Sequence, residues 1–454
     1  MDLPQAYKER MEKQLGNTYE AFLAEYQKER VYGLRYNPLK IEKEALVSCL
    51  LEHQVTLEEV PWAKEGFYYP PGAQPGKLPL HEAGAYYIQE PSAMVAAELL
   101  QPEPGEKILD LCASPGGKST QIAGRMQGKG LLVANEIIPL RAKILSRNIE
   151  RMGIANAVVL NETPKRLAER FPQFFDRIVV DAPCSGEGMF RKDLEARGEW
   201  SEQQVEACAV RQRDILSLAA AMLKPGGRLV YSTCTFAPQE NEQNAAWFVK
   251  EYPQFTLEAS EQILPHEKRG EGHYAARFYK KEAPDPGKAE NKKKASDVKK
   301  GGAGKKELAV CSGLIQKFLS EYLSADMQKQ LFNGIQEGRL AVFGERLYLM
   351  PPQIGSLDGL KTERAGLELG CCKKNRFEPS HALAMALHPG DVRQCLELKE
   401  PERFLRGETL SCGGQAGWTL VTVRGCSLGW GKASQGVLKN HYPKGLRRNC
   451  GRQS

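Results

Sequence analysis

Residues 108–120 read ILDLCASPGGKST, an apolar run followed by a turn of small residues and then by the start of a helix. A strand that passes through glycine into a helix forms the edge site where α/β sheets bind ligands, because glycine lets a ligand approach the backbone and the helix offers free N–H groups. The spacing fits neither GxxxxGK[ST] nor GxGxxG, so a P-loop is excluded and a dinucleotide is disfavoured. The stretch predicts an α/β fold with a different ligand at this turn.

The sequence on either side of this turn extends the same fold. Between about residues 104 and 250, apolar runs alternate with helical stretches, as in a doubly wound, Rossmann-like parallel sheet. Helices are expected at 139–152 and 203–223. The expected strands are near-continuous apolar runs, typical of strands covered on both faces, at residues 107–112, 131–136, 157–160, 177–181 and 228–232.

Composition divides the rest of the chain. Residues 281–306 contain no Leu, Ile, Phe, Tyr or Trp, so they cannot bury enough apolar surface to offset their ordering entropy and are predicted to be a flexible basic linker. Residues 1–103 are expected to be mainly helical, with a helix over 86–100 that leads into the sheet domain. After the linker, a helix is expected at 314–331 and short strands from about residue 335.

The formal net charge of +7 is concentrated in two short segments. Residues 280–306 hold ten lysines against four acids, and residues 431–454 hold six lysines and arginines with no acid. The main body is slightly acidic, so a diffuse affinity for polyanions is not expected. For the linker lysines we expect at most weak attraction to phosphate.

Membrane, secretory and metal-binding classes are disfavoured. The chain has no apolar run of about 18 residues, its N-terminus MDLPQAYKERMEKQL has no apolar core, and its 12 cysteines are scattered without a CxxC…CxxC pair. A reducing cytoplasm is the expected compartment, and neither a membrane partner nor a bound metal is expected.

Glu136 ends the strand that follows the glycine turn, about 20 residues beyond Gly116. A carboxylate at this position suits a ribose diol, whose two hydroxyl groups donate hydrogen bonds. The combination indicates a nucleoside cofactor without a pyrophosphate, and S-adenosylmethionine is the leading candidate. The alternative is that Gly116 and Gly117 only form a turn and that Glu136 is a solvated strand end.

Cysteines follow two further strand ends, in DAPCSGEGMF (181–190) and STCTF (232–236). A free cysteine is usually a small buried hydrophobe, but Cys184 and Cys234 are expected beside the same crevice. An enzyme that methylates amino groups would carry an aromatic residue in place of Cys184. A thiolate can instead add to C6 of cytosine and thereby activate C5, while Asp181 stabilises the charge that develops on the ring.

The motifs resemble those of the Nol1/Nop2/Sun family of RNA cytosine-5 methyltransferases, in particular its bacterial small-subunit rRNA methyltransferase F branch. The resemblance covers essentially the whole chain. The matching stretches are LRYNPLK (34–40), YYIQEPSAM (86–94), DLCASPGGKS (110–119), NEI (135–137), DAPCSGEGMFRKD (181–193), YSTCTFAPQENE (231–242), GEGHYAARF (270–278) and LGWGK…LKNHYPKGLR (428–447).

The resemblance implies a role for each matching residue. Cys234 is the expected nucleophile, Cys184 assists product release, and Asp181 lies between cofactor and base. Glu136 is the expected ribose acid. The cofactor loop is expected to comprise Cys112, Ala113, Ser114, Pro115, Gly116, Gly117 and Lys118.

One position departs from the family pattern. Where many members have an aspartate that contacts the adenine side of the cofactor, this chain has Thr163. Either Thr163 makes this contact through its hydroxyl group or backbone, or Glu162 substitutes for the aspartate.

The resemblance also implies the function: S-adenosylmethionine-dependent methylation of cytidine C5 in 16S rRNA by a cytoplasmic monomer, with naked rRNA or the small ribosomal subunit as partner. Two alternatives are a tRNA cytosine-5 methyltransferase and a non-catalytic RNA-binding ribosome-assembly factor. DNA cytosine-5 enzymes use the Pro-Cys cysteine as nucleophile, so the presence of both cysteines favours RNA.

The implied domains are an N-terminal RNA-binding or support region (1–103), the methyltransferase domain (104–280), the linker (281–306), a small family-specific domain (307–380) and a PUA-like RNA-binding domain (381–454). Residues 438–448 interleave His441 and Tyr442 with basic residues, which suits an RNA contact. Arg191 and Lys192 are expected to hold the target strand. His273 and His381 are expected to be ordinary polar residues.

Overall fold

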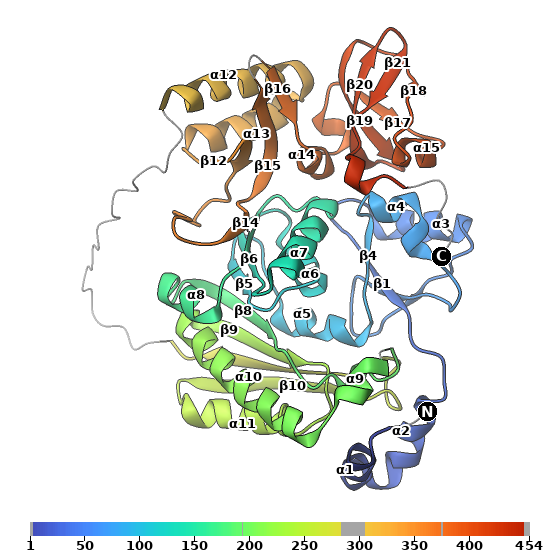
Figure 1. Ribbon diagram of the computed structural model, residues 1–454, viewed down its shortest axis with the longest axis vertical. Helices are drawn as coiled ribbons and strands as arrows, with labels where there is room; N and C mark the ends of the chain where they lie inside the picture. The colour runs from blue at the N-terminus through green and yellow to red at the C-terminus, as the bar shows by residue number, and fades with distance from the viewer. Residues whose placement is uncertain (1–2, 193, 283–304, 374–375, 449–454) are drawn as a thin grey trace, which may run out of the picture.

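The computed structural model describes residues 3–192, 194–282, 305–373 and 376–448, so most of the expected linker lies outside the described residues. An eight-stranded sheet with strand order β10-β11-β9-β8-β5-β6-β7-β14 forms the centre of the molecule (Figure 1). At one edge, β10 (Phe255–Ile263) and β11 (His273–Lys280) are antiparallel to their neighbours. Its parallel strands are β5 (Lys107–Asp110), β6 (Leu131–Asn135), β7 (Ala157–Leu160), β8 (Phe175–Asp181) and β9 (Leu223–Thr233). The five strands expected from the sequence are therefore confirmed to within a few residues.

Helices cover both faces of this sheet, as a doubly wound fold requires. One face packs against α5 (Val95–Leu100), α6 (Gly117–Met126) and α7 (Pro139–Arg151). The other face packs against α8 (Pro164–Arg170), α10 (Glu202–Met222) and α11 (Glu242–Glu251). The helices expected at 139–152 and 203–223 correspond to α7 and α10.

The strand order determines where the ligand crevice lies. β5 lies between β8 and β6, so the connections that leave its two sides run in opposite directions, and a crevice opens at its carboxyl end. On β8 and β9, Asp181 pairs in register with Ser232. The two loops that carry Cys184 and Cys234 therefore begin side by side at this crevice.

The N-terminal region holds a sheet that the sequence did not predict. Its helices include α1 (Gln5–Leu15), α2 (Tyr19–Glu25) and α3 (Lys43–Glu52). Its antiparallel sheet has the order β2-β3-β1-β4, in which β2 is Glu58–Glu59 and β3 is Gly66–Tyr68. The helix expected over 86–100 is wrong in its first part, because residues 86–88 form β4 (Tyr86–Ile88), which pairs with β1 (Gly33–Tyr36). Pro91 disfavours helix in the residue before it, and the helix α5 begins only at Val95.

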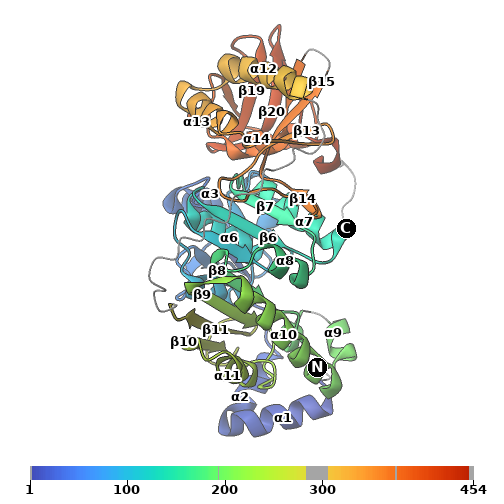
Figure 2. The ribbon, with the colours of Figure 1, turned by 90° about the vertical axis from the view of Figure 1, so that its left-hand side faces the viewer.

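The hairpin of α1 and α2, termed here the N-terminal hairpin, lies apart from the rest of this region, at the end of the molecule opposite the C-terminal domains (Figure 2). Its apolar residues, among them Tyr7 and Phe22, pack against Phe190, Trp200 and Phe236 of the sheet domain. The hairpin therefore shares a core with the segments that follow Cys184 and Cys234.

The first part of the C-terminal half joins two helices to a four-stranded sheet of order β12-β13-β15-β16. These strands are β12 (Leu340–Phe343), β13 (Arg346–Leu349), β15 (Leu367–Lys373) and β16 (Arg376–Pro379). The single helix expected at 314–331 is instead two, α12 (Lys305–Tyr322) and α13 (Ala325–Gln336), because Ser324 caps a new helix by accepting a hydrogen bond from the N–H of Met327. From the same part, β14 (Thr362–Arg364) extends to the central sheet and pairs with β7.

The last part of the chain forms a five-stranded sheet of order β17-β19-β20-β21-β18, with β17 (Cys395–Glu397) and β18 (Leu410–Ser411) at its edges. Its strands β19 (Gly417–Val423), β20 (Cys426–Ser434) and β21 (Val437–Asn440) contribute buried residues to one cluster with α3 and β1 of the N-terminal region. We call this cluster the terminal core. Among the described residues, no helix is long and apolar enough to cross a membrane.

Candidate active site

The glycine turn between β5 and α6 is fixed by short contacts. The hydroxyl of Ser119 donates a hydrogen bond to Asp110 Oδ2 at 2.6 Å, and the N–H of Ala113 donates to the carbonyl of Asn135 at 2.8 Å. Gly116 has φ +115°, a left-handed conformation that residues with a Cβ rarely adopt. The turn therefore requires glycine at this position.

The N-terminal region supports this turn from behind. Arg35 is almost fully buried and donates to the carbonyl of Gly117 at 2.6 Å and to the Thr120 hydroxyl at 2.9 Å. Burial lowers the pKa of Arg35 to about 10, which still leaves the guanidinium charged at neutral pH. The LRYNPLK motif thus positions the cofactor loop rather than forming a site of its own.

A cavity of about 310 Å³ opens beside the turn. It is lined by most of the predicted site residues, namely Cys112, Ala113, Ser114, Pro115, Gly117, Lys118, Asp181 and Cys234. It is also lined by residues that the sequence did not single out, among them Glu90, Asp110, Met189, Glu271 and Gly272. Lys192 and His273 complete the wall. Gly116, Glu136, Thr163 and Cys184 do not line it.

Two buried carboxyl groups near the turn could hold a polar ligand. Asp110 is fully buried, its Oδ1 has no hydrogen-bond partner, and burial raises its pKa to about 7. Glu136 is buried one residue beyond β6 and accepts the N–H of Ile138 at 2.9 Å. An ionised carboxylate has further lone pairs, so Glu136 can still accept hydrogen bonds from a diol.

Thr163 has a structural role. It is exposed and caps α8, its hydroxyl accepting a hydrogen bond from the N–H of Arg166 at 3.3 Å. The neighbouring Glu162 is buried, and its carboxylate accepts the N–H of Lys361 at 2.8 Å from the C-terminal half. Both side chains are therefore engaged in contacts that hold elements together.

Asp181 carries an ion pair at the centre of the site. Its Oδ2 lies 2.8 Å from Lys118 Nζ, and its Oδ1 accepts a hydrogen bond from the Ser232 hydroxyl at 2.9 Å. Burial alone would raise the pKa of Asp181, but these contacts outweigh it, and the pKa lies below its ordinary value. The group is therefore a carboxylate at neutral pH, which accepts hydrogen bonds and donates none.

The two cysteines meet as the sequence predicted. The Sγ atoms of Cys184 and Cys234 are 3.2 Å apart, and the N–H of Cys234 points to Cys184 Sγ at 3.4 Å. The hydrogen bond to Cys234, followed by burial, raises the pKa of Cys184 well above its ordinary value. Cys184 is therefore a neutral thiol that can donate to the sulfur of Cys234.

The loops that carry the cysteines approach each other closely. The N–H of Gly188 donates to the carbonyl of Cys234 at 2.8 Å. A Cβ at Gly188 would lie only 2.8 Å from the carbonyl oxygen of Gly272 and 3.0 Å from that of Cys234. Only glycine fits here, which explains its place in the motif DAPCSGEGMF.

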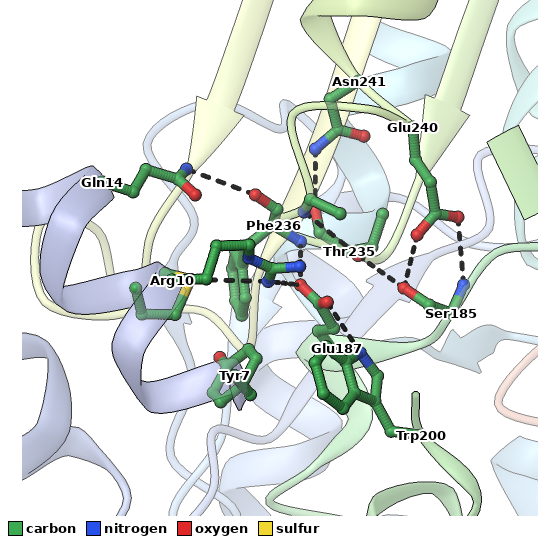
Figure 3. A network of polar contacts seen from close by, with 12 residues as sticks. Tyr7, Arg10, Gln14, Ser185, Glu187, Trp200, Thr235, Phe236, Glu240 and Asn241 are labelled. Carbon is green, nitrogen blue, oxygen red and sulfur yellow. Dashed lines mark hydrogen bonds and ion pairs between the residues drawn. The ribbon is translucent and has the colours of Figure 1, made fainter. Parts of the chain in front are cut away.

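A buried carboxylate, Glu240, joins the two loops. It accepts the N–H of Ser185 at 3.1 Å and an amide hydrogen of Gln212 at 2.7 Å, and the Ser185 hydroxyl also donates to it (Figure 3). The Ser185 hydroxyl lies 2.8 Å from that of Thr235, next to Cys234. Burial raises the pKa of Glu240, although these hydrogen bonds oppose the shift.

A second buried carboxylate, Glu187, ties both loops to the N-terminal hairpin. It accepts the N–H of Phe236 at 3.0 Å and the indole N–H of Trp200 at 2.9 Å, and it forms an ion pair of 2.6 Å with Arg10 of α1 (Figure 3). Gln14, one turn further along α1, donates to the carbonyl of Phe236 at 3.2 Å. The hairpin therefore helps to fix the backbone two residues beyond Cys234.

Sequence reasoning missed Glu187 and Glu240, although both lie inside quoted motifs. A glutamate two residues after Ser185, or in a run such as PQENE, reads as a solvated residue, and nothing local indicates that either is fully buried. Their partners at positions 10 and 212 lie far away in sequence.

Some expected RNA contacts are wrong. Arg191 is buried and pairs with Glu271 at 2.6 Å, so it holds the wall of the site rather than a nucleic-acid strand. In the C-terminal segment, Tyr442 is buried against Phe404, and Arg448 donates to the carbonyl of Lys77 at 2.6 Å. These side chains make contacts within the protein rather than with RNA.

Other basic residues of the C-terminal segment remain on the surface. Lys432 and Lys439 are exposed cross-strand neighbours on β20 and β21. His441 is exposed and its ring packs on Trp418, over which Lys432 also lies at 5.6 Å. Cations beside aromatic rings suit contact with RNA phosphates and bases. In the part of the chain that the structure describes, no cluster of His, Cys, Asp or Glu is arranged to hold a metal ion.

Known families match this chain from end to end. Residues 3–91 match the N-terminal domain of 16S rRNA methyltransferase RsmF, and residues 97–280 match 16S rRNA methyltransferase RsmB/F. Residues 317–387 match the first C-terminal domain of RsmF rRNA methyltransferase, and residues 395–448 match the methyltransferase RsmF PUA domain.

Individual proteins agree with these matches. The chain is 33% identical to ribosomal RNA small subunit methyltransferase F of Vibrio vulnificus, over 94% of this chain and 93% of that protein. It is 31% identical to the protein of the same description from Citrobacter koseri, over 98% and 97%. A methyltransferase homolog protein from Pyrococcus horikoshii superposes with a TM-score of 0.56 at 27% identity, covering 61% of this chain and 95% of that one. The resemblance inferred from the motifs is thus confirmed: the chain belongs to the ribosomal RNA small subunit methyltransferase F family and is an RNA methyltransferase.

Proposed function

We propose that this enzyme methylates C5 of a cytidine in 16S rRNA, with S-adenosylmethionine as methyl donor and a covalent bond between Cys234 and C6 of the base as intermediate. The observation that carries the proposal is the pair of sulfur atoms 3.2 Å apart, of which that of Cys234 lies in the lining of the same cavity as Asp181. C5 of cytosine is a poor nucleophile until a group adds to C6, and a thiolate is suited to that addition.

The residues around the cavity fit S-adenosylmethionine. The unpartnered oxygen of Asp110 supplies an acceptor inside the cavity, and Glu136, which is buried near the turn but not on the cavity wall, would accept hydrogen bonds from the ribose hydroxyls. The backbone from Cys112 to Lys118 would hold the rest of the molecule against the open glycine turn. When bound, S-adenosylmethionine supplies an electrophilic methyl group.

The side chains of this chain have separate tasks in the reaction. The sulfur of Cys234 forms a bond to C6 and raises the electron density at C5. After methylation, the C5 proton leaves to water, the C6–S bond breaks, and its electron pair returns to the sulfur. The thiol of Cys184 donates a hydrogen bond to that sulfur and so stabilises the leaving thiolate.

Substitution of each cysteine tests the proposal. Cys234→Ala should abolish formation of 5-methylcytidine while binding of S-adenosylhomocysteine, measured by calorimetry, persists. Cys184→Ala should accumulate a covalent enzyme–RNA adduct on denaturing gels. Cys371→Ser, a half-buried cysteine in the C-terminal half, is the control and should leave both readouts unchanged. Full activity of Cys234→Ala would refute the mechanism, and the absence of an adduct with Cys184→Ala would remove its role in release.

The choice of RNA needs its own measurement. Bisulfite sequencing of rRNA and tRNA from cells with and without the gene should show one or more 16S positions that lose methylation. Loss confined to tRNA would favour the alternative of a tRNA cytosine-5 methyltransferase with the same chemistry.

A further inference from the structure

His273 is a buried side chain of the cavity wall that the mechanism above does not use. It is the first residue of β11 (His273–Lys280), the antiparallel neighbour of β9, whose last residues precede Cys234. Only 3% of its surface is exposed, and its Nε2 has no hydrogen-bond partner. The nearest acidic atom is Asp181 Oδ1 at 3.7 Å, which is too far for a hydrogen bond. An unpartnered buried polar atom is costly, and because this one lies in the cavity wall, a bound ligand can pair with it.

The surroundings of His273 determine its protonation state. Burial lowers its pKa to about 3, and the positive charges of Lys118 and Lys192 act in the same direction while Asp181 opposes them. The imidazole is therefore neutral at physiological pH and carries hydrogen on one of its two ring nitrogens. Because the carboxylate of Asp181 faces Nε2, it favours the tautomer with the hydrogen on that atom. His273 thus presents a neutral N–H donor to the cavity.

Together, Asp181 and His273 match the hydrogen-bond donor and acceptor on the Watson–Crick edge of cytosine. Cytosine presents a donor at N4 and an acceptor at N3 on its Watson–Crick edge. Asp181, as a carboxylate, can accept from N4 but cannot donate to N3. His273 supplies the missing donor within the same cavity. Uracil presents the reverse pattern, an acceptor at position 4 and a donor at N3, and would leave both protein groups mismatched.

We propose that Nε2–H of His273 donates a hydrogen bond to N3 of the flipped cytosine while Asp181 accepts one from N4, so that the two residues select cytosine over uracil. The inference rests on the proposed C5 chemistry. When the sulfur of Cys234 adds to C6, electron density moves onto the ring and reaches N3. A donor that is already in place at N3 stabilises this charge, as donors in an oxyanion hole do.

The test compares His273→Phe, which keeps a ring of similar size without a donor, with His273→Gln, whose side-chain amide retains an N–H. With 16S rRNA as substrate, His273→Phe should lower kcat about 100-fold, the loss typical of removing one such donor. His273→Gln should recover at least a tenth of the wild-type rate. Nucleoside mass spectrometry of the product should also show a higher ratio of 5-methyluridine to 5-methylcytidine for His273→Phe. Equal losses in the two variants, or a fully active His273→Phe, would overturn the inference.

Further readouts separate this role from others. The affinity for S-adenosylhomocysteine should stay within about twofold, which shows that the cavity remains folded. The profile of kcat between pH 6 and 9 should keep its shape in His273→Gln, because a neutral donor does not titrate there; loss of one limb would indicate a general base instead. His81→Phe is the matched control, since His81 also has an unpartnered Nδ1 and a pKa lowered by burial to about 3 but lies outside the cavity. If wild-type enzyme forms no 5-methylcytidine, the proposed function fails; if it does and His273→Phe matches it, only this inference fails.

Discussion

The two halves of the active site are built in different ways. The cofactor half is a strand, a glycine turn and a helix that follow one another directly in sequence, held by contacts such as that of Ser119 with Asp110. The cysteine half is two loops held from beneath by the fully buried carboxylates of Glu187 and Glu240 (Figure 3). A backbone turn leaves room for a ligand to enter, whereas buried charge networks fix side chains in one arrangement. Binding and chemistry should therefore respond separately to substitution.

Glu240→Ala should have the largest effect on catalysis relative to its effect on cofactor binding. This change leaves the N–H of Ser185 and an amide hydrogen of Gln212 without their acceptor and also removes an acceptor of the Ser185 hydroxyl, which contacts Thr235. We expect kcat to fall about 1,000-fold and stability to fall by about 3 kcal/mol, since buried hydrogen bonds to a charged group are among the strongest. Methyl transfer and calorimetric binding of S-adenosylhomocysteine measure the two halves.

Two further variants make this result decisive. Glu240→Gln keeps one acceptor oxygen and should lie between wild type and Glu240→Ala. The exposed Glu242→Ala, from the same segment, is the control and should match wild type. Equal losses of catalysis and cofactor affinity in Glu240→Ala would show that the halves are not independent.

Arg10→Met should have the next largest effect. It leaves the carboxylate of Glu187 buried without its cation, a change that typically costs about 3–5 kcal/mol. We expect a lower melting temperature and a kcat reduced about 30-fold, because Phe236 N–H depends on the same carboxylate oxygen. In a double-mutant cycle, Arg10→Met with Glu187→Gln should recover part of both losses. Exposed Lys13→Met on the same helix serves as the control, and an Arg10→Met enzyme with wild-type kcat would contradict a positioning role for the hairpin.

Glu136→Gln probes the cofactor half and should show the opposite pattern. A neutral amide accepts fewer hydrogen bonds from a ribose diol, so KM for S-adenosylmethionine should rise about tenfold while kcat changes little. Steady-state kinetics with saturating RNA measure both constants. The exposed Glu169→Gln is the control. A fall in kcat with unchanged KM would assign Glu136 to the cysteine half instead.

The smallest expected effect leaves both halves intact. Lys432→Ala combined with Lys439→Ala removes two exposed cations of the C-terminal sheet and should reduce the slope of log affinity for RNA against log salt by about 1.5, from roughly 0.7–0.9 per phosphate contact. Filter binding at several salt concentrations measures this slope. An unchanged slope would indicate that RNA is bound by other residues, for example by Lys192 at the cavity. Truncation after Leu428 would be a poorer test, because it cuts β20 (Cys426–Ser434) in the middle.

The difference between local and long-range contacts explains which features could be predicted from the sequence. The helix expected at 203–223 is found at Glu202–Met222, and the glycine turn lies where the motif predicts it, because periodicity and turn chemistry are local signals. The sheet around β1, the strand β14 and the roles of Arg10 and Glu187 depend on partners distant in sequence. Pattern alone cannot reveal such pairings, since the same residues read equally well as solvated.

The terminal core has a consequence for the order of synthesis. Its residues come from two distant parts of the chain: Leu34 and Phe67 lie in the N-terminal region, while Val421, Leu428 and Leu438 are made only after the whole sheet domain. While the ribosome is still translating, the apolar face of the early segment has no cover, even though the sheet domain between them is complete. Full burial of that face must wait until the last strands have left the exit tunnel. A nascent chain of this enzyme therefore has a long interval in which chaperones can bind the uncovered face.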